Sequence, residues 1–266
     1  MIDERVQLMA NDAVADDFYL ARWQAPHIAA HVEPGQFVNI EVAAGVAPLL
    51  RIPLSVCAAD PQAGYIDVLY EDMGPKSRAL SRLVPGVQTQ CLGPLGRGFR
   101  PPAQGAGAIL VGGGIGVPPM LYWGAVLRRC GVRVALLVGA RHRGKHLPDP
   151  LLAPAADAVR RATDDGSLGH AGLVTDLLRD ELAGVGPHQV YSCGPHGMVQ
   201  AVAALCGEMD APCQVSLEEY MACGIGICVG CAVELVGAED DSDYSRYARI
   251  CVDGPVFDAR RVKWGH

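Results

Sequence analysis

Short β-rich stretches alternate with turn residues over the first hundred residues of the chain. They cover residues 36–42, 54–58, 65–70 and 87–92, and glycine or proline punctuates the gaps between them. Regularly spaced short strands of this kind are typical of a small antiparallel barrel. The pattern therefore predicts an antiparallel β-barrel over residues 1–100, and a proline-rich stretch directly after it predicts a domain boundary.

Beyond this boundary, continuous apolar runs precede segments of helical length. We expect buried strands at 108–112, 132–139 and 189–192, and helices at 120–129 and 198–209. Strands that alternate with helices build βαβ units around a parallel sheet. The chain is therefore expected to be a multi-domain β plus α/β protein, with an α/β domain over residues 101–212.

The remaining residues, 213–266, form a third region with cysteines, glycines and short strands. Its acidic stretch 237–245 is expected to be an exposed hairpin tip.

Composition narrows the classes of function. Hydrophobic residues make up 50% of the chain and charged residues 19%, a balance that excludes disorder and a fibrous repeat. A net charge of −7 and only 6% aromatic residues argue against binding to nucleic acid. No apolar run reaches the roughly 18 residues of a membrane span, and the charged N-terminus is unlike a signal peptide. We therefore expect a cytoplasmic protein whose ten cysteines are reduced.

Four of these cysteines have the spacing of an iron–sulfur site. Cys223, Cys228 and Cys231 form a C-x4-C-x2-C motif, and Cys251 follows after 19 further residues. This spacing is typical of plant-type [2Fe–2S] clusters, in which three thiolates share one tight loop and a distant fourth closes the cluster. The interleaved glycines let the backbone approach the inorganic sulfides.

The alternatives for this motif are a structural zinc site and buried free thiols. Zinc ribbons usually pair two C-x2-C knuckles, and this chain has only one. Cysteines that serve only in packing would not place three thiols within nine residues. The sequence therefore predicts a [2Fe–2S] cluster with ligands Cys223, Cys228, Cys231 and Cys251.

Two glycine-rich turns each follow an expected strand and open an expected helix. They are VGGGIGVPPM at 111–120 and SCGPHGM at 192–198. Backbone N–H groups in such turns can approach a pyrophosphate, and the carboxyl ends of parallel strands meet at one crevice. The alternative for the first turn is a plain strand–helix connection. The candidate nucleotide-binding residues are Gly113, Gly114, Gly116, Gly194 and Pro195.

Three other residues have a functional and a structural interpretation each. Cys193, in the second turn, either projects into the crevice or fills space as a small buried residue. On an expected barrel strand, Arg51 can hold a phosphate and Ser55 can hydrogen-bond a ring nitrogen. An arginine on a strand is otherwise a solvent-exposed residue.

Taken in order, these motifs resemble the ferredoxin–NADP reductase superfamily, and within it the electron-transfer subunits of type B dihydroorotate dehydrogenase. RIPLS resembles the flavin-binding strand, LGPLGRGF the link out of the barrel, and GGGIGVPP and SCGP the NAD-binding turns. The most specific match is SLEEYMACGIGICVGC with CVDGPVFDARRVKW, which resembles the cluster domain. There are two departures. Ile52 stands where the family commonly has an arginine, and GPKS at 74–77 replaces a Gly-x-Gly-Thr loop.

The resemblance implies three redox groups: FAD on the barrel, NAD(H) at the glycine-rich turns, and the [2Fe–2S] cluster. Ser55, near the reactive edge of the flavin, and Cys193 are the implied catalytic residues. The implied FAD-binding residues are Arg51, Ile52, Pro53, Leu54, Ser55, Leu69, Tyr70, Glu71, Lys76 and Ser77.

The resemblance also implies a partner, because a cluster that accepts single electrons needs an outlet. That partner would be an FMN-containing catalytic subunit that oxidises dihydroorotate to orotate in pyrimidine biosynthesis, in a heterotetramer with two copies of each chain. Ile225, Ile227 and Val229 either form a docking patch for it or pack beneath the cluster.

Alternatives to this function remain open. Similar motifs occur in the flavin and iron–sulfur subunit of NADH-dependent ferredoxin:NADP oxidoreductase and sulfide dehydrogenase, where the first cluster ligand tends to be an aspartate. A stand-alone reductase and a non-catalytic redox-sensing module are two further possibilities. The coenzyme is also open, because Arg141, Arg143 and Lys145 follow the second parallel strand, where basic residues favour the 2′-phosphate of NADPH.

Overall fold

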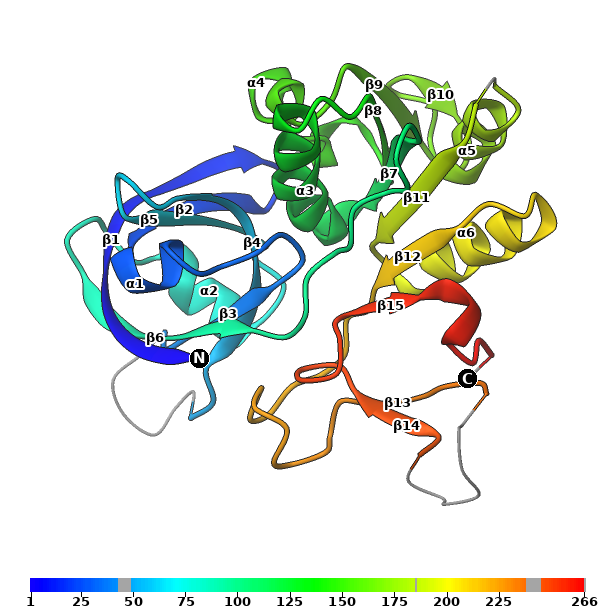
Figure 1. Ribbon diagram of the computed structural model, residues 1–266. Coiled ribbons are helices and arrows are strands. Elements are labelled where there is room, and N and C mark those ends of the chain that lie inside the picture. Colours follow the sequence, from blue (N-terminus) through cyan, green and yellow to red (C-terminus); the bar gives the residue numbers. More distant parts are fainter. Residues whose placement is uncertain (43–48, 185, 238–244, 266) are drawn as a thin grey trace.

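Six antiparallel strands close into the expected barrel (Figure 1). The computed structural model describes residues 1–42, 49–184, 186–237 and 245–265. The elements of the barrel are β1 (Ile2–Ala15), β2 (Phe18–Gln24), α1 (Pro26–Ala29), β3 (Phe37–Ile40), β4 (Ile52–Asp60), β5 (Tyr65–Glu71), α2 (Pro75–Ser81) and β6 (Gln88–Leu95). Around the barrel the strands follow the order β1-β2-β5-β4-β3-β6.

The alternation of side chains along β3 and β4 decides which residues face the barrel interior. On β3, Val38 and Ile40 are completely buried in the barrel core, so the other two residues of the strand point outward. Residues directly opposite each other in an antiparallel pair share a face of the sheet. The outward pairs are Phe37–Ser55 and Asn39–Pro53, which together we call the β3–β4 face.

The sequence pattern missed the first two strands. On β1, Val6 and Leu8 alternate as core residues, but Glu4 also occupies a buried position. Its carboxylate accepts hydrogen bonds from the backbone N–H groups of His27 (3.1 Å) and Ile28 (3.0 Å) in α1. These bonds offset the cost of burying a carboxylate, and they explain why an acidic residue interrupts the apolar pattern of a core strand.

A seven-stranded sheet follows the barrel, in the order β10-β9-β8-β7-β11-β12-β15. Its strands are β7 (Gly107–Gly113), β8 (Val134–Ala140), β9 (Ala158–Thr163), β10 (His170–Ala171), β11 (His188–Cys193), β12 (Cys213–Ser216) and β15 (Val256–Asp258). The pairs from β10 to β12 are parallel, and β15 alone is antiparallel to its neighbour.

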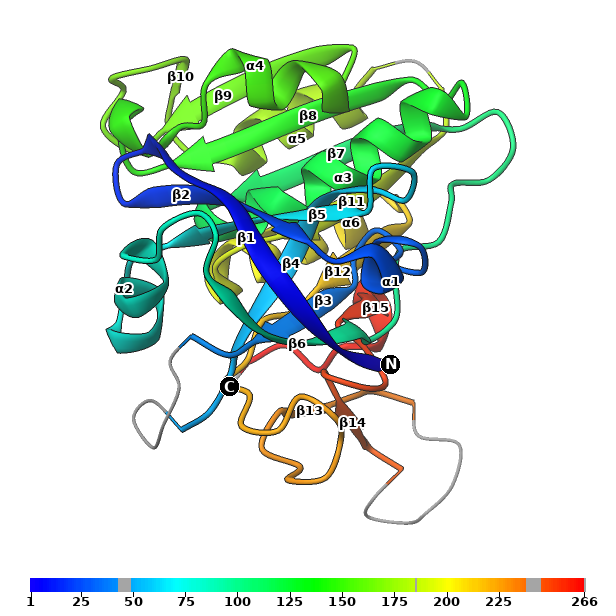
Figure 2. The same ribbon diagram turned by 90° about the vertical axis from the view of Figure 1, so that its left-hand side faces the viewer.

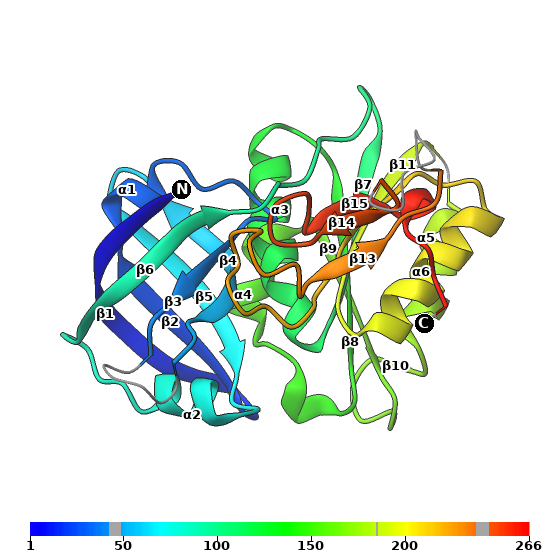
Figure 3. The same cartoon turned by 90° about the horizontal axis from the view of Figure 1, so that it is seen from below.

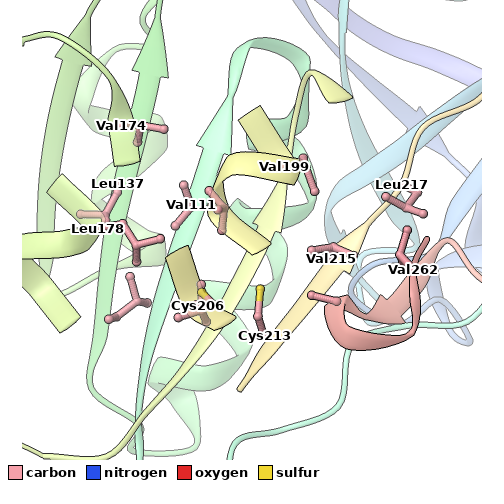
Figure 4. Packing of buried hydrophobic residues seen from close by; sticks show 14 of the residues in the cluster. Val111, Leu137, Val174, Leu178, Val199, Cys206, Cys213, Val215, Leu217 and Val262 are labelled. Carbon is pink, nitrogen blue, oxygen red and sulfur yellow. The ribbon is translucent and has the colours of Figure 1, made fainter. Parts of the chain in front are cut away.

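Helices cover both faces of this sheet (Figures 1 and 2). They are α3 (Val117–Arg129), α4 (Asp149–Leu152), α5 (Val174–Leu182) and α6 (His196–Glu208), with short 3₁₀ turns η1 (Gly114–Gly116), η2 (Arg143–Lys145), η3 (Ala153–Ala155) and η4 (Ala259–Arg261). The helices α3 and α4 pack on one face, and α5 and α6 pack on the other through the core drawn in Figure 4. No helix in the described ranges is long and apolar enough to cross a membrane.

The boundary expected at residues 212 and 213 does not separate two folding units. β12 begins at Cys213 and pairs with β11, and β15 pairs with β12 in turn. The sheet therefore takes two strands from the expected third region, because backbone pairing between distant segments leaves no local signal in the sequence.

The rest of the third region, which we call the cluster segment (218–255), lies below the sheet and beside the barrel (Figures 1 and 3). It contains the loop 218–231 and the hairpin of β13 (Ala232–Glu234) and β14 (Tyr247–Arg249). Most of the hairpin tip expected at 237–245 lies outside the described residues.

A glycine in α3 provides a test of the packing between helix and sheet. A Cβ atom at Gly124 would overlap the carbonyl oxygen of Ala155. We predict that Gly124→Ala lowers the free energy of unfolding by about 1–3 kcal/mol through overpacking. The control is Gly207 of α6, where a Cβ would meet no heavy atom within 4 Å. Gly207→Ala should leave that energy unchanged or raise it by up to about 1 kcal/mol. If urea unfolding shows the same loss of unfolding free energy in both variants, the close packing of Gly124 against Ala155 does not explain the effect.

Candidate redox site

The four cysteines of the expected cluster lie together in the cluster segment, as two pairs. The thiol of Cys223 interacts with that of Cys228 on the loop, and the thiol of Cys251 interacts with that of Cys231 across the β13–β14 hairpin. The hairpin pair is almost completely buried, and the backbone N–H of Ile250 donates to the carbonyl of Cys231 (3.0 Å). The structure thus brings together all four residues that the spacing singled out.

The loop around Cys223 fits a thiolate ligand. The backbone N–H groups of Cys228 (3.4 Å) and Ile225 (3.5 Å) donate to its Sγ atom. Partial burial works against ionisation of this thiol, but these N–H groups outweigh it and lower the pKa of Cys223 to about 6. Gly224 and Val229 have φ angles of 69° and 59°, a conformation that a β-branched residue rarely adopts. The loop is therefore strained to turn its amides toward sulfur.

Cys251 of the second pair is protonated at neutral pH. Burial, followed by the neighbouring Cys231, raises the pKa of Cys251 to about 12. A metal must displace this proton on binding, as thiolate ligands require. Within the described parts of the chain, no three cysteine, histidine or acidic side chains are grouped around one point that could hold a single metal ion. Two pairs of thiols suit a two-iron cluster better than one tetrahedral zinc ion.

A pocket of about 700 Å³ lies at the carboxyl ends of the parallel strands, against the barrel. Gly113, Gly139 and Asp164 line it at or just after the ends of β7, β8 and β9. Open α/β sheets bind dinucleotides in this position. The barrel contributes Phe18, Glu71 and Met73, and the cluster segment contributes Glu218.

The two glycine-rich turns meet at this pocket. Gly113, Gly114 and Pro195 line it. A Cβ at Gly116 would overlap the backbone of Cys193 and Gly194, so only glycine allows the first turn to pack against the second. The structure thus brings three of the five expected nucleotide-binding residues to the pocket wall, whereas Gly116 and Gly194 form the contact between the two turns.

Cys193 does not reach the pocket. Its side chain is completely buried and absent from the pocket lining, and its Sγ lies 3.8 Å from Oε1 of Glu218. Burial, and after it the charge of Glu218, raises the pKa of the Cys193 thiol well above its usual range, so the thiol stays protonated at neutral pH. Of its two interpretations, the small buried residue matches the structure.

Glu218 is the residue that sequence reasoning missed. Desolvation raises the pKa of Glu218, even though the residue remains accessible from the pocket. Its position directly before the cluster motif, in SLEEYM, is the signal that could have identified it.

Only some of the expected FAD-binding residues can present a side chain to a ligand. Pro53 and Ser55 belong to the β3–β4 face, and the Ser55 hydroxyl has no hydrogen-bond partner in the described ranges. Glu71 lines the pocket. The side chains of the others are packed in the barrel core or under α3, so they could offer only backbone groups; they are Ile52, Leu54, Leu69 and Tyr70.

The expected phosphate-binding residues are partly engaged within the protein. Arg51 forms a two-pronged ion pair with Asp3 (2.9 and 3.0 Å), so it must exchange this partner to hold a phosphate. The Ser77 hydroxyl accepts hydrogen bonds from the N–H groups of Met73 and Gly74, which shapes the start of α2. Lys76 donates only to the carbonyl of Arg51 (3.0 Å), and its ammonium has no ion pair among the described residues. Of the two expected cations, Arg51 is thus ion-paired and Lys76 is not, within the described residues.

The three apolar residues of the cluster loop differ in their exposure to solvent. Ile225 packs against the core that contains Cys231 and Cys251. Ile227 and Val229 are 76% and 54% exposed, and Tyr220 at the start of the loop is 95% exposed. The docking interpretation therefore applies to Ile227 and Val229, whereas Ile225 packs inside.

Comparison with known proteins agrees with this geometry. Residues 218–263 match the family described as the iron–sulfur cluster binding domain of dihydroorotate dehydrogenase B. Over 97% of its length, the chain is 37% identical to the "Dihydroorotate dehydrogenase B (NAD(+)), electron transfer subunit" of Geobacillus thermodenitrificans, 98% of which is covered. It is 34% identical to the subunit of the same name from Desulforamulus reducens, with 97% of each chain covered.

Solved structures confirm the expected fold. An NADH-dependent reduced ferredoxin–NADP oxidoreductase, described in work on flavin-based electron bifurcation, has a TM-score of 0.84 and 26% identity, over 97% of this chain and 89% of that one. Phthalate dioxygenase reductase has a TM-score of 0.64 over 98% of this chain and 96% of that one. Its 19% identity supports the fold alone.

The cluster ligands can be tested against a matched cysteine. We predict that Cys228→Ser abolishes or grossly alters the visible cluster spectrum, because it removes one ligand of an iron. Cys130 is also exposed but lies at the end of α3, so Cys130→Ser should leave the spectrum unchanged. Metal analysis of the unaltered chain should find two irons. One zinc in their place would refute the assignment.

Proposed function

The chain belongs to the family of dihydroorotate dehydrogenase B electron transfer subunits, and from this premise we propose that it carries electrons between NAD and a catalytic partner subunit. The observation that carries the proposal is the arrangement of three sites around the barrel. The nucleotide pocket, the β3–β4 face and the paired cysteines lie within one chain, and Glu218 of the cluster segment lines the pocket.

Each site has residues that suit one redox group. When bound, FAD takes two electrons from NADH as a hydride and exchanges them singly with a [2Fe–2S] cluster. From the β3–β4 face, Ser55 presents a hydroxyl without a hydrogen-bond partner among the described residues, and Lys76 presents an ammonium for the pyrophosphate. The glycine-rich turns hold the nicotinamide nucleotide, with Gly113 and Pro195 in the pocket wall. Cys223, Cys228, Cys231 and Cys251 hold the cluster.

The substrate would be oxidised on the partner subunit. We propose that this partner is an FMN-bearing chain that converts dihydroorotate to orotate, and that two copies of each chain form the complex. Support comes from the exposed apolar side chains of Tyr220, Ile227 and Val229, which accompany the cysteine loop at the surface. Apolar side chains gathered on one exposed loop are a feature of protein interfaces.

A second function deserves comparison because of the structural neighbour with a TM-score of 0.84. The subunit of a ferredoxin:NADP oxidoreductase would share the fold of this chain. The first cluster ligand position here is Cys223, whereas an aspartate is expected there in that relative. The dihydroorotate proposal is therefore favoured.

NADH is the proposed coenzyme, because the cations near the pocket are mostly engaged. Lys145 donates to Asp17 and Glu71, both at 2.8 Å, and Arg143 donates to the carbonyl of Ser167. Arg141 lines the pocket, but so does Asp164. A 2′-phosphate would meet one available guanidinium and a carboxylate, which does not favour NADPH.

This coenzyme preference predicts the effect of a single charge. Asp164→Asn should raise kcat/KM for NADPH about fivefold, the equivalent of the ~1 kcal/mol that one charge contributes near 4 Å in water. It should leave kcat/KM for NADH nearly unchanged. Asp165 is the control, because it bonds to Ser167 and does not line the pocket. Steady-state dye reduction measures both values. An Asp165→Asn variant with the larger gain would refute the argument.

The partner proposal predicts a division of activities. The purified chain should oxidise NADH with artificial dyes but should not turn over dihydroorotate, and adding the FMN subunit should restore NAD⁺-linked turnover. Ile227→Glu should weaken assembly by at least about tenfold, because central apolar interface residues contribute ~2 kcal/mol or more, while dye reduction is retained.

Val84 offers the matched control for Ile227. It is 64% exposed on a turn of the barrel before β6, so Val84→Glu should leave assembly intact. Titration of one subunit with the other by light scattering or calorimetry gives the affinity. Dihydroorotate oxidation by the isolated chain would contradict the division of labour, and unchanged assembly of the Ile227 variant would contradict the docking surface.

A further inference from the structure

One barrel side chain makes direct contact with the cysteine loop. Asn39, on β3, is only 3% exposed, and its Nδ2 donates a hydrogen bond to the carbonyl oxygen of Cys223 (3.3 Å). In the described ranges, no other side chain of residues 1–100 hydrogen-bonds to the loop 223–231. Arg249 of the cluster segment also holds the loop, because its Nη1 donates to the carbonyl of Gly226 (3.1 Å).

Asn39 also belongs to the face on which flavin binding is proposed. It lies opposite Pro53 on β4 and opposite Leu92 on β6. Leu92 packs against the apolar core that contains Cys231 and Cys251. At this row of the barrel, Pro53 of the proposed flavin strand and Leu92 therefore flank β3 on its two sides, and Asn39 is the polar side chain between them.

The contact is close enough to restrict the loop. Gly224 has a φ of 69°, and a Cβ atom there would overlap Nδ2 of Asn39. The loop can pass over the amide only because its first residue after Cys223 is glycine. The backbone of the cysteine loop therefore packs directly against the side-chain amide of Asn39.

The barrel itself does not need this amide. The Oδ1 atom of Asn39 is buried without a hydrogen-bond partner among the described residues, and the only partner of Nδ2 is the cluster loop. An unpaired buried oxygen destabilises a fold, so an apolar residue would serve the barrel better. The polar side chain is explained by its contact with the loop of Cys223.

We propose that Asn39 is a positioning residue for electron transfer between the flavin and the cluster. By holding the carbonyl of Cys223, it fixes the first cluster ligand at a set distance from the β3–β4 face and orients its backbone. Hydrogen bonds of this outer kind tune the electronic properties of a metal centre as well as its place. The inference rests on the proposed function, because it assumes FAD on β4 and a cluster on the four cysteines.

The test uses the complete chain loaded with FAD and iron. Asn39→Leu keeps the size of the side chain and removes its donor. In anaerobic stopped-flow mixing with NADH, the rate of cluster bleaching relative to that of flavin bleaching should fall about tenfold or more, as expected for loss of an outer-shell bond. The electron paramagnetic resonance spectrum of the dithionite-reduced cluster should also shift, which requires no turnover.

Thr89→Val is the matched control. Thr89 lies on β6, and its hydroxyl donates to a backbone carbonyl, that of Glu41 (2.7 Å), away from the cluster loop. Its loss removes the same kind of bond from the barrel and should change neither rate nor spectrum. If Asn39→Leu fails to retain iron, Asn39→Ser is measured in its place, because it removes the reach of the amide without adding apolar bulk.

The outcomes separate this inference from the proposed function. If the unaltered chain shows flavin and cluster bands that bleach with NADH, but the Asn39 variants retain the rate and the spectrum of the unaltered cluster, the positioning role is refuted alone. A parallel loss of flavin reduction would also refute it, since Asn39 would then act at the flavin. Absence of flavin and iron from the unaltered chain would refute the proposed function.

Discussion

The alternation of side chains across β3 and β4 is the constraint on which the arrangement of the sites depends. With Val38 and Ile40 fixed in the barrel core, Phe37 and Asn39 must point outward, and the antiparallel register places Ser55 and Pro53 beside them. A shift of one residue would turn this set inward and expose the core. Because the hydrophobic core determines the register, it also determines which groups can meet a flavin and which can hold the cysteine loop.

The three parts of the molecule are fixed to one another by specific contacts. Lys145 of η2 reaches Asp17 and Glu71 of the barrel, and these carboxylates outweigh desolvation and raise the pKa of Lys145. The backbone N–H of Arg97, just after the barrel, donates to the carbonyl of Gly254 in the cluster segment (2.6 Å). The sheet continues into that segment through β12 and β15. These contacts connect the barrel, the sheet and the cluster segment to one another.

Features encoded by neighbouring residues could be predicted from the sequence. The cysteine motif and the two glycine-rich turns depend on local spacing, and the structure gathers their residues as expected. Features that depend on distant partners could not. Glu4 interrupts the apolar pattern of β1, and its burial is possible only because α1 donates hydrogen bonds to its carboxylate. Strand β12 joins the sheet by pairing with β11, which no local sequence pattern predicts. The ion pair between Arg51 and Asp3 likewise joins residues that are distant in the sequence.

In the proposed function FAD binds on the β3–β4 face, and NADH reduces the cluster only through this FAD. The most direct measurement compares the complete chain with a chain stripped of flavin but retaining its iron, each mixed anaerobically with NADH. We predict that the cluster bands bleach after the flavin bands in the complete chain and do not bleach in the flavin-free chain. Reduction of the cluster by NADH without flavin would contradict it.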